Sequence, residues 1–407
     1  MDNLNKIPIT IFTGAGASSA KNIELPTMKE FFKQIMAEES HDIINDRITG
    51  KKLKDFFKYV MDTLYGPRNL DNDYDLERVM GALYDMNNFM QNDCWKIFMN
   101  PNIASILKNS LGTIYKKSTS AFNSTPIQFD PTNLLQETLE NEFNKNKELA
   151  GQLILDLEDI IRDKYDSASE EGIRSVYEPF FELIRTKYKD KNETNPGLLP
   201  FFTTNYDMCI DWFFDPQDPN FSIISDTWLS KDSVSFKLFD GFMGGSKWIE
   251  NKYSNIEAEG ENIINIVYHK LHGSLYWERV KGIITKGSNS TRDQKAKPDL
   301  VLIYPSDKKI LTDEPFAYNH RMLDRYLSRT DKFLIIGFSF RDPMIVQAFD
   351  YALKFNPELK AYIINPPVEK GTYKEMDRFL KDWQGRVEHI ETYFGSDECI
   401  NKLDEIL

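Results

Sequence analysis

The alternation of apolar and helical segments after Pro200 constrains the fold of this chain more than any other feature. Short runs rich in β-branched and aromatic residues are followed by helical patterns of roughly 10–15 residues, which is typical of βαβ units. We therefore expect an α/β fold built on a doubly wound parallel sheet. The expected strands are 199–203, 221–225, 263–269, 300–304, 332–337 and 360–365, and the expected helices are 315–328, 343–355, 373–383 and 397–407.

The first strand of this sheet is expected far from the others in the chain. Residues 7–12 have the pattern of a buried strand and run straight into a glycine-rich turn. From residue 28 to 191 the chain is almost entirely helical in pattern, most clearly at 28–39, 51–65, 75–90, 92–107, 133–164 and 171–187. We predict a Rossmann-like domain formed by 1–30 and 197–407, interrupted by a helical insertion domain, 31–196.

Two polar stretches interrupt the second half of the chain. Residues 230–262 and 280–298 are expected to form mobile loops or small covering elements. The basic run at 286–297 is most simply a solvated loop.

Charge and cysteine content disfavour several classes of protein. The formal net charge is −13, whereas a surface that follows DNA phosphates carries clustered Lys and Arg, so nucleic acid is expected only through a larger complex. No apolar run approaches the roughly 18 residues of a membrane span, and residues 1–6 lack a signal-peptide pattern. Cys94, Cys209 and Cys399 lie far apart, so we expect neither disulfides nor a four-cysteine zinc site. These features favour a cytoplasmic protein.

The turn after the first strand has the composition of a phosphate-binding turn. Gly14, Ala15, Gly16 and Ser18 lie where a dinucleotide pyrophosphate rests on a helix N-terminus, and a Cβ there would keep a phosphate from the backbone. The match to G-x-G-x-x-G is incomplete, because Ser19 holds the third glycine position. A glycine-rich β–α turn without a ligand is the alternative.

Two polar side chains follow the strand expected at 199–203. Asn205 and Asp207 lie two residues apart at the edge where open α/β sheets bind ligands. The amide can hold a ribose or a water, and the carboxylate can accept a hydrogen bond from a carboxamide. An Asx turn that joins the strand to a helix is the alternative.

His272 follows the strand expected at 263–269 and precedes Gly273 and Ser274. It is one of only five histidines in the chain. Because imidazole titrates near neutral pH, His272 is a candidate general base. A histidine with a purely structural role is the alternative.

Polar residues also follow the last two strands. The strand at 332–337 ends in GFSFRDP, where Gly337 and Ser339 can meet a phosphate or a ribose. Asp342, immediately before Pro343, is expected to cap a helix, and we prefer this reading to a role in the site. Asn365 closes the strand at 360–365, where it can hydrogen-bond a ribose or an adenine edge.

The order of these motifs resembles that of sirtuins: Gly-Ala-Gly-x-Ser, Thr-x-Asn-x-Asp, His-Gly, Gly-x-Ser and Ile-Asn. The sequence is similar to bacterial sirtuin-like proteins, which carry Thr-Thr-Asn-Tyr-Asp, Leu-His-Gly-Ser and Gly-x-Ser-x-x-Asp-Pro. The resemblance covers residues 1 to about 30 and most of 199–370, and leaves out the helical insertion.

The resemblance implies NAD⁺ as the substrate and gives each motif a role. Asn205 would hold the nicotinamide ribose and the attacking water, Asp207 would bind the carboxamide, and His272 would act as the base on ribose or water. The residues implied to bind the rest of NAD⁺ are Gly14, Ala15, Gly16 and Ser18 at the phosphates, Pro26 and Thr27 in the cofactor-binding loop, Thr204 and Gly337, and Ser339 and Asn365 at the adenosine half.

Two departures from the sirtuin pattern concern the reaction. Sirtuin deacetylases carry a Cys₄ zinc ribbon after the catalytic histidine, whereas no cysteine occurs there in this chain, so no zinc is expected. The sirtuin loop Gly-Ile-Pro-Asp-Phe-Arg corresponds to IELPTM at 23–28, without the Phe and the Arg. The resemblance therefore implies an NAD⁺ glycohydrolase that releases nicotinamide and ADP-ribose, rather than a protein deacylase.

The resemblance also implies a biological setting. Similar proteins are NAD⁺-depleting effectors of antiphage defence, and those of this size commonly pair with a HerA-type hexameric ATPase. A homo-oligomer is expected, and no membrane partner. Two alternatives stay open: a nucleotide-binding regulatory or assembly subunit without turnover, and a nuclease component of a complex with an ATPase.

Overall fold

The chain divides into two compact units that are not continuous in sequence. A computed structural model describes residues 6–36, 48, 51–65, 76–91, 131–190, 197–214, 235–243, 247–248, 263–286, 300–303, 314–367 and 373–407. One unit comprises Met1–Phe31 and Ile161–Leu407, and the other comprises Phe32–Ile160. The helix expected at 92–107 and the strand expected at 221–225 lie outside the described residues.

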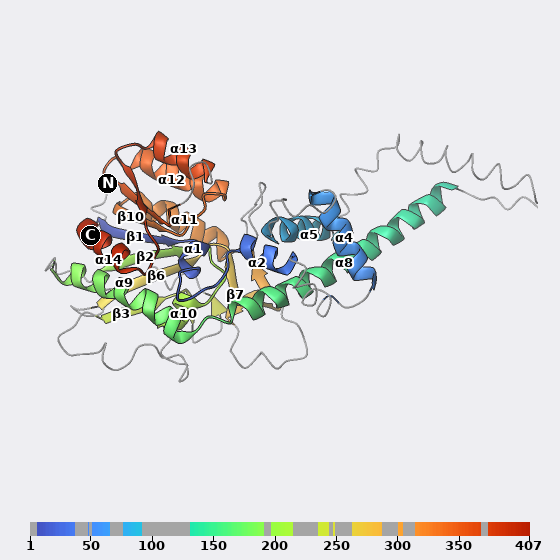
Figure 1. Ribbon diagram of the computed structural model, residues 1–407. Helices are drawn as coiled ribbons and strands as arrows, with labels where there is room; N and C mark the ends of the chain where they lie inside the picture. Colours follow the sequence, from blue (N-terminus) through green and yellow to red (C-terminus); the bar gives the residue numbers. More distant parts are fainter. Residues whose placement is uncertain are drawn as a thin grey trace, which may run out of the picture. The chain divides into compact units, whose positions relative to one another are not determined.

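A seven-stranded sheet with all strands parallel forms the centre of the first unit, and it confirms the expected α/β, Rossmann-like fold (Figure 1). β1 lies in the middle, between β10 and β2. The strands β2, β3 and β6 lie on one side of it and the later strands β10, β11 and β12 on the other, so the strand order reverses beside β1. Open α/β sheets bind ligands beside such a switch point. In sheet order the strands are β12 (Val387–Glu391), β11 (Lys360–Asn365), β10 (Thr330–Ile336), β1 (Ile7–Thr13), β2 (Leu198–Thr203), β6 (Ile263–Lys270) and β3 (Ser235–Phe239).

Helices cover both faces of this sheet, because successive strand residues point to opposite sides. Phe202 of β2 lies in the core on one face, whereas its neighbour Phe201 stacks on Phe181 on the other face, with ring centroids 6.3 Å apart. The first face carries α11 (Phe316–Leu327), α12 (Pro343–Phe355) and α13 (Lys374–Asp382), and the second carries α9 (Glu170–Asp190), α10 (Cys209–Phe214) and α14 (Asp397–Ile406).

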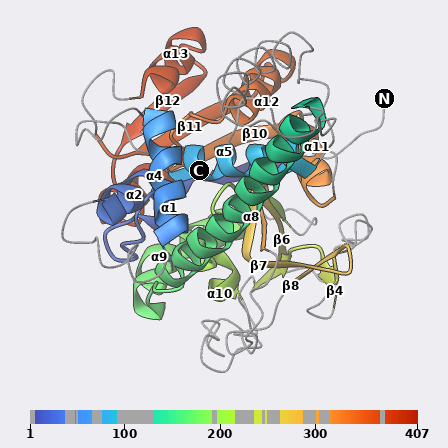
Figure 2. The same cartoon turned by 90° about the vertical axis from the view of Figure 1, so that its right-hand side faces the viewer.

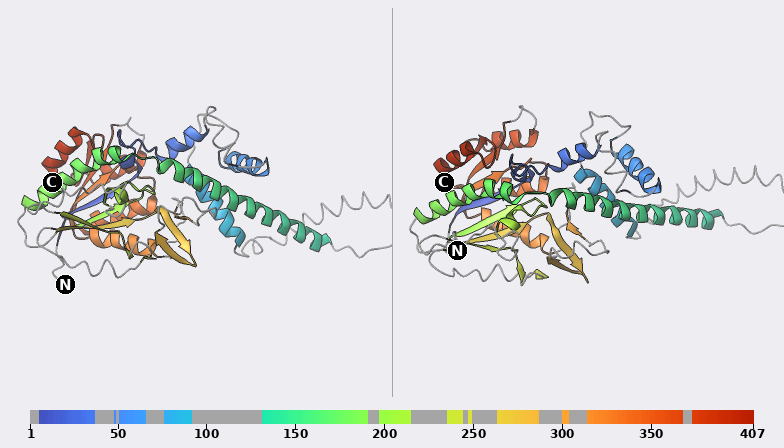
Figure 3. Two further views of the ribbon diagram at one scale, coloured as in Figure 1. Left: turned by 90° about the horizontal axis from the view of Figure 1, so that it is seen from below. Right: turned by 60° about the horizontal axis from the view of Figure 1, so that its bottom comes forward.

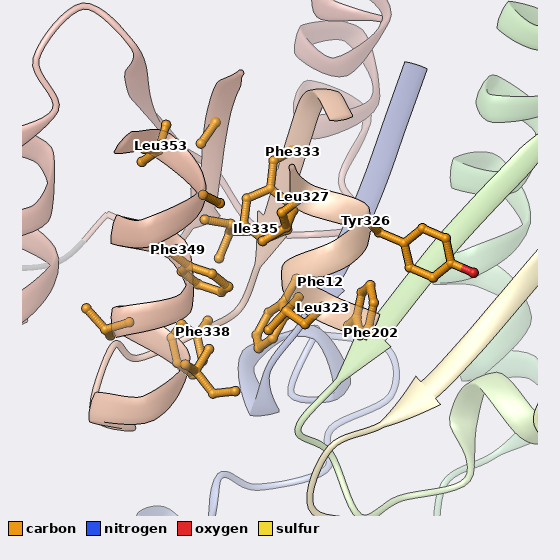
Figure 4. Close-up of a cluster of buried hydrophobic side chains, with 14 of the residues drawn as sticks. Phe12, Phe202, Leu323, Tyr326, Leu327, Phe333, Ile335, Phe338, Phe349 and Leu353 are labelled. Carbon is orange, nitrogen blue, oxygen red and sulfur yellow. The ribbon is translucent and has the colours of Figure 1, made fainter. Parts of the chain in front are cut away.

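The core on the first face holds the loop that follows β10 in place (Figure 4). Phe12 of β1 makes edge-to-face contacts with Phe338 and Phe349, each with ring centroids 5.0 Å apart. Burying one such side chain contributes about 1.5–3 kcal/mol. Because Phe338 belongs to the loop after β10, this packing fixes the loop against the central strand.

A second, antiparallel sheet of five strands is built from segments on both sides of β6 in the chain. In sheet order its strands are β4 (Phe242–Met243), β5 (Lys247–Trp248), β8 (Ile283–Lys286), β7 (Gly273–Val280) and β9 (Leu300–Leu302), of which β4, β7 and β8 are labelled in Figure 2. Two expectations were wrong. The strand expected at 300–304 pairs antiparallel with β7 and does not join the parallel sheet. The polar stretch 230–262 contains β3, which is an edge strand of the main sheet.

The described part of the second unit is helical (Figure 3). α4 (Lys51–Tyr65) and α5 (Leu76–Gln91) lie in it, together with most of α8 (Pro131–Tyr165). Tyr84 of α5 donates a hydrogen bond of 2.5 Å to Glu158 of α8. None of the described helices has both the length and the apolar character required to cross a membrane.

The division between the units falls inside two helices. It lies within α2 (Met28–Met36) at one end and within α8 at the other. α9, which the sequence analysis included in the helical insertion, belongs to the unit that contains the sheet. The predicted insertion, 31–196, therefore extends beyond the compact helical unit at its C-terminal end.

Candidate functional site

Four neighbouring strands of the main sheet end side by side. Their register aligns Thr13 with Ile336 on one side and with Thr203 on the other, and Thr203 with Lys270. Each strand is followed at once by one of the motifs identified in the sequence. The sheet therefore brings the glycine turn, the Asn205 segment, the His272 segment and the Gly337 loop to one edge.

The glycine turn after β1 packs directly on the loop after β10. The backbone N–H of Gly16 donates to the carbonyl of Gly337 at 2.8 Å. Gly337 has a φ of +67°, and a Cβ there would lie 2.1 Å from the nitrogen of Ala17. A Cβ at Gly14 would lie 2.7 Å from the Gly337 carbonyl oxygen. Glycine is thus required by the contact of the two turns, so these glycines alone do not establish a phosphate site.

Ser18, which directly follows the glycine turn, is hydrogen-bonded to Asn205. The amide nitrogen of Asn205 donates to Ser18 Oγ at 2.9 Å, and its backbone N–H donates to Thr203 Oγ1 at 3.0 Å. Both Ser18 and Asn205 are buried. The other amide atom, Asn205 Oδ1, is buried without a hydrogen-bond partner among the described residues. An unsatisfied buried acceptor costs about 1–3 kcal/mol, so this atom requires a donor from a ligand or a water.

Asp207 is buried, and its backbone and side chain both make hydrogen bonds. Its Oδ1 accepts from the backbone N–H of Cys209 at 3.0 Å, which is the Asx turn that the sequence analysis held as the alternative. Its carbonyl oxygen accepts from Nζ of the buried Lys270 at 2.5 Å. This contact ties the segment after β2 to the end of β6.

His272 is paired with a carboxylate that sequence analysis assigned to helix capping alone. Its Nε2 lies 2.9 Å from Oδ2 of Asp342, and both side chains are almost fully buried. The capping prediction is confirmed as well, because Oδ1 of Asp342 accepts from the backbone N–H groups of Met344 and Ile345 at 3.0 and 3.4 Å. The pairing with His272 was missed, because the order of strands that brings β6 and β10 to one edge is not encoded in either motif.

Gly273 explains why a glycine follows this histidine. Its φ is +88°, and a Cβ there would lie 2.0 Å from the carbonyl oxygen of Val301. The backbone turns sharply at this residue, leaves the main sheet after β6 and enters the second sheet as β7. The carbonyl of His272 accepts from the N–H of Ile303 at 2.8 Å, which holds the histidine between the two sheets.

A buried network of charges lies beside this segment. Nζ of Lys270 is 2.9 Å from Asp211, and Nζ of Lys286 is 3.3 Å from Asp211 and 2.9 Å from Asp240. Burial alone would raise the pKa of Asp211, but the two lysines lower it below its usual value. The expectation that Lys286 belongs to a solvated loop was wrong, since this residue ends β8 and anchors the second sheet to α10.

Cys209 and Tyr177 are fully buried close to Ser18 and Asp207. Burial and the charge of Asp207 raise the pKa of the Cys209 thiol well above its usual value, and burial raises that of the Tyr177 phenol. A protonated thiol is a poor nucleophile. Cys209 is therefore a structural residue and not a candidate for covalent catalysis.

The remaining predicted site residues lie around this edge in two groups. Pro26 and Thr27 stand at the start of α2, where Pro26 O accepts from Tyr165 Oη at 2.7 Å. Thr27 forms a capping box with Glu30, each accepting from the other's backbone N–H. Thr27 thus has a structural role that accounts for its presence.

The second group lies near the glycine turn and the β10 loop. Asn365 is buried and donates to the carbonyl of Phe338 at 2.9 Å, so it supports the β10 loop. Ser339, in the same loop, is half-buried. Thr204 donates its backbone N–H to Thr13 O at 3.1 Å, and Ala15 begins α1 (Ala15–Ser18), a helix of one turn.

Comparison with known families agrees with this geometry. Residues 200–387 match the family model of the SIR2-like domain. The matched segment contains Asn205, His272, Gly337 and Asp342, and leaves out the glycine turn and the helical unit. SIR2-like domains bind NAD⁺ and are typically NAD-dependent enzymes, so the match supports a sirtuin-like protein with an NAD-related activity. No curated protein matches the chain.

Within the described ranges, no group of three or more His, Cys, Asp and Glu side chains is arranged to hold a metal ion. Cys209 and Cys399 are both buried free thiols, and Cys94 lies outside the described residues.

Proposed function

We propose that this protein hydrolyses NAD⁺ at the nicotinamide–ribose bond and releases nicotinamide and ADP-ribose. The observation that carries the proposal is Asn205. Its amide is buried and is oriented by Ser18, and its oxygen has no donor among the described residues at the edge where the glycine turn and His272 also lie. An orphaned acceptor at a sheet's ligand-binding edge is what a ribose hydroxyl or a water would satisfy.

The chemistry of this bond suits such a site. Nicotinamide leaves NAD⁺ as a neutral molecule, so the enzyme needs no strong acid. It has to hold the ribose, stabilise an oxocarbenium-like centre and orient a water. Asn205 would hold the ribose and the water, and His272 would accept the proton from one of them. Asp207 would bind the carboxamide through the part of its carboxylate that does not cap α10.

Two features of the chain support hydrolysis rather than deacylation of a protein. The residues after His272 contain no cysteine before Cys399, so the four-cysteine zinc ribbon of sirtuin deacetylases has no counterpart in the sequence. The segment after β6 instead supplies β7, β8 and β9 of the antiparallel sheet.

Substitution of Asn205 and His272 tests the proposal directly. The purified protein should release nicotinamide from NAD⁺, and chromatography measures the rate of this release. His272→Ala should lose at least about 100-fold of this rate, because general-base catalysis contributes on the order of 10²–10⁴-fold. Asn205→Ala should also lose most of the rate, because the ribose and the water are no longer oriented. Both variants should keep the wild-type circular dichroism spectrum.

A matched control is His389→Ala on β12, at the far edge of the sheet, which should retain the wild-type rate. An Asn205→Ala protein that released nicotinamide at the wild-type rate would refute the assignment. Tight NAD⁺ binding by the wild type without nicotinamide release would instead support a regulatory or assembly subunit that binds nucleotide without turnover.

We also propose that this activity depletes NAD⁺ in antiphage defence, in a homo-oligomer that pairs with a HerA-type hexameric ATPase. The resemblance of the ordered motifs to bacterial sirtuin-like proteins supports this setting. The pairing is tested by measuring nicotinamide release and the molecular mass of the assembly, with the protein alone and with such an ATPase. A rate of release and an assembly mass that the ATPase leaves unchanged would count against the pairing.

A further inference from the structure

We propose that Asp342 positions His272 by fixing its tautomer, with the proton on Nε2 and the lone pair on Nδ1. The proposal starts from one short contact, 2.9 Å between His272 Nε2 and Asp342 Oδ2. Both side chains are 2–3% exposed, so water does not compete for this bond. The part of the proposal that concerns turnover rests on the NAD⁺ hydrolysis proposed above.

The two oxygens of Asp342 have separate partners. Oδ1 accepts from the backbone N–H groups of Met344 and Ile345, and Oδ2 faces His272. A carboxylate accepts hydrogen bonds at both oxygens and donates none. Its partner nitrogen on His272 must therefore be the donor. Proton placement on Nε2 leaves Nδ1 as the basic atom of the neutral ring.

The helix that follows strengthens this arrangement. Asp342 is the N-cap of α12, and the partial positive charge of a helix N-terminus favours a carboxylate there. The helix cap also fixes the side chain, since two backbone N–H groups hold Oδ1 while Oδ2 stays directed at the imidazole. A histidine that takes up a proton during a reaction would then do so beside an oriented anion.

The alternative is that Asp342 is only a helix cap, and two substitutions separate the roles. Asparagine and serine cap helices about as well as aspartate. In Asp342→Asn, the amide presents N–H groups to Nε2, which favours the tautomer with the proton on Nδ1. In Asp342→Ser, the side chain is shorter and no longer reaches His272. Loss of a similar carboxylate in the Ser-His-Asp triad costs about 10⁴-fold in kcat through the wrong tautomer.

Both variants should bind NAD⁺ with little change in KM, and kcat should fall by at least about 100-fold. Asp342→Asn should keep a melting temperature close to that of the wild type, because it retains both the cap and a hydrogen-bonding group at Nε2. Asp342→Ser retains the cap but leaves the buried Nε2 without this partner, so its melting temperature should fall modestly. Ser396→Ala is the matched control. It removes the side-chain cap of α14, which accepts from Cys399 N–H at 3.2 Å, and should lower the melting temperature while kcat stays unchanged.

The tautomer itself can be measured without any turnover. Long-range ¹H–¹⁵N correlation spectra of the protein labelled at histidine, recorded near pH 8, distinguish a ring protonated on Nε2 from one protonated on Nδ1. The His272→Ala spectrum assigns the His272 signals among those of the five histidines. We expect the Nε2–H form in the wild type and the Nδ1–H form in Asp342→Asn.

The results distinguish failure of this inference from failure of the proposed function. Wild-type kcat and KM in Asp342→Asn, or an Nδ1–H ring in the wild type, would overturn the positioning role and leave NAD⁺ hydrolysis standing. A wild-type protein that released no nicotinamide would remove the proposed function, while the tautomer in the spectra would still support or overturn the inference. If Asp342→Asn did not fold, the wild-type spectrum and Asp342→Ser would decide.

Discussion

His269 and His272 are three residues apart in sequence, yet the fold gives them different surroundings. His269 is fully buried within β6, where its ring stacks on Phe202 with centroids 4.9 Å apart. Its Nδ1 lies 2.9 Å from Asn319 Oδ1. His272 lies beyond the end of β6 and faces the carboxylate of Asp342. A carboxylate beside His272 favours its protonated form, whereas burial lowers the pKa of His269 to about 4, so His272 is the better suited of the two to carry a proton during a reaction.

The burial of His269 predicts a pH dependence of stability. Burial lowers the pKa of His269 to about 4, although the hydrogen bond with Asn319 raises it. In the unfolded chain a histidine has a pKa of about 6.5. Between these values the unfolded state binds a proton that the folded state does not. The contribution of His269 to the free energy of unfolding is therefore fully present above pH 6.5. About 2–3 kcal/mol of it is lost as the pH falls toward 4.

Urea unfolding at about pH 7.5 and pH 4.5 measures this loss. Because carboxylates also titrate over this range, the comparison is made with His269→Gln, whose stability should fall less between the two conditions. His320→Gln, on α11, controls for the removal of a histidine. If the free energy of unfolding fell equally between the two pH values in the wild type and in His269→Gln, the prediction would be contradicted.

At the residue scale, the sequence located the motifs but not all of their partners. Asn205 and His272 follow strands, and a residue that ends a strand can be identified from local pattern. The contact of His272 with Asp342 depends instead on the order of β6 and β10 in the sheet. That order is set by packing between distant segments, and nothing in the sequence next to either residue reports it.

At the scale of elements, the two sheets share no strand, and a buried group of charges helps to join them. Lys286 of β8 and Lys270 of β6 both contact Asp211 of α10. Asp211 and Lys270 have exposed fractions of only 4% and 2%. Removing one partner of a buried pair leaves the other uncompensated, and this typically costs about 3–5 kcal/mol.

Lys270→Met should therefore lower the free energy of unfolding by about 3–5 kcal/mol, measured by urea denaturation. Asp211→Asn should lower it as well, and the double variant should lose less than the sum of the two, by about 0.5–3 kcal/mol. The exposed pair Arg378–Glu375 provides the control, since Arg378→Ala should cost less than about 1 kcal/mol. Additive losses at Lys270 and Asp211 would show that the two side chains are not coupled.

Long elements with a clear period were predictable, and short or non-locally paired ones were not. α4, α12 and β11 begin and end at the predicted residues, because their apolar spacing is regular. β3 escaped prediction because it is a five-residue edge strand within a polar stretch. The sheet that β9 joins was mispredicted, because the partner of a short apolar run depends on the rest of the fold.

At the scale of the whole molecule, the candidate site belongs to one of the two units. All of the residues predicted to contact NAD⁺, and Asp342, fall within Met1–Phe31 or Ile161–Leu407. The helical unit has apolar residues of its own that are fully buried, among them Leu76, Val79 and Leu83 of α5. Nicotinamide release should therefore tolerate a weakened helical unit.

Leu83→Ala tests this division. Leu→Ala at a fully buried position costs about 2–5 kcal/mol, and this loss should appear in the helical unit as faster hydrogen exchange in α5. Nicotinamide release by the protein alone should stay within twofold of the wild type. Leu353→Ala, a matched substitution in α12, should instead speed exchange in the first unit. If Leu83→Ala abolished nicotinamide release, the reaction would depend on the helical unit, and the site would not be complete within the unit that contains the sheet.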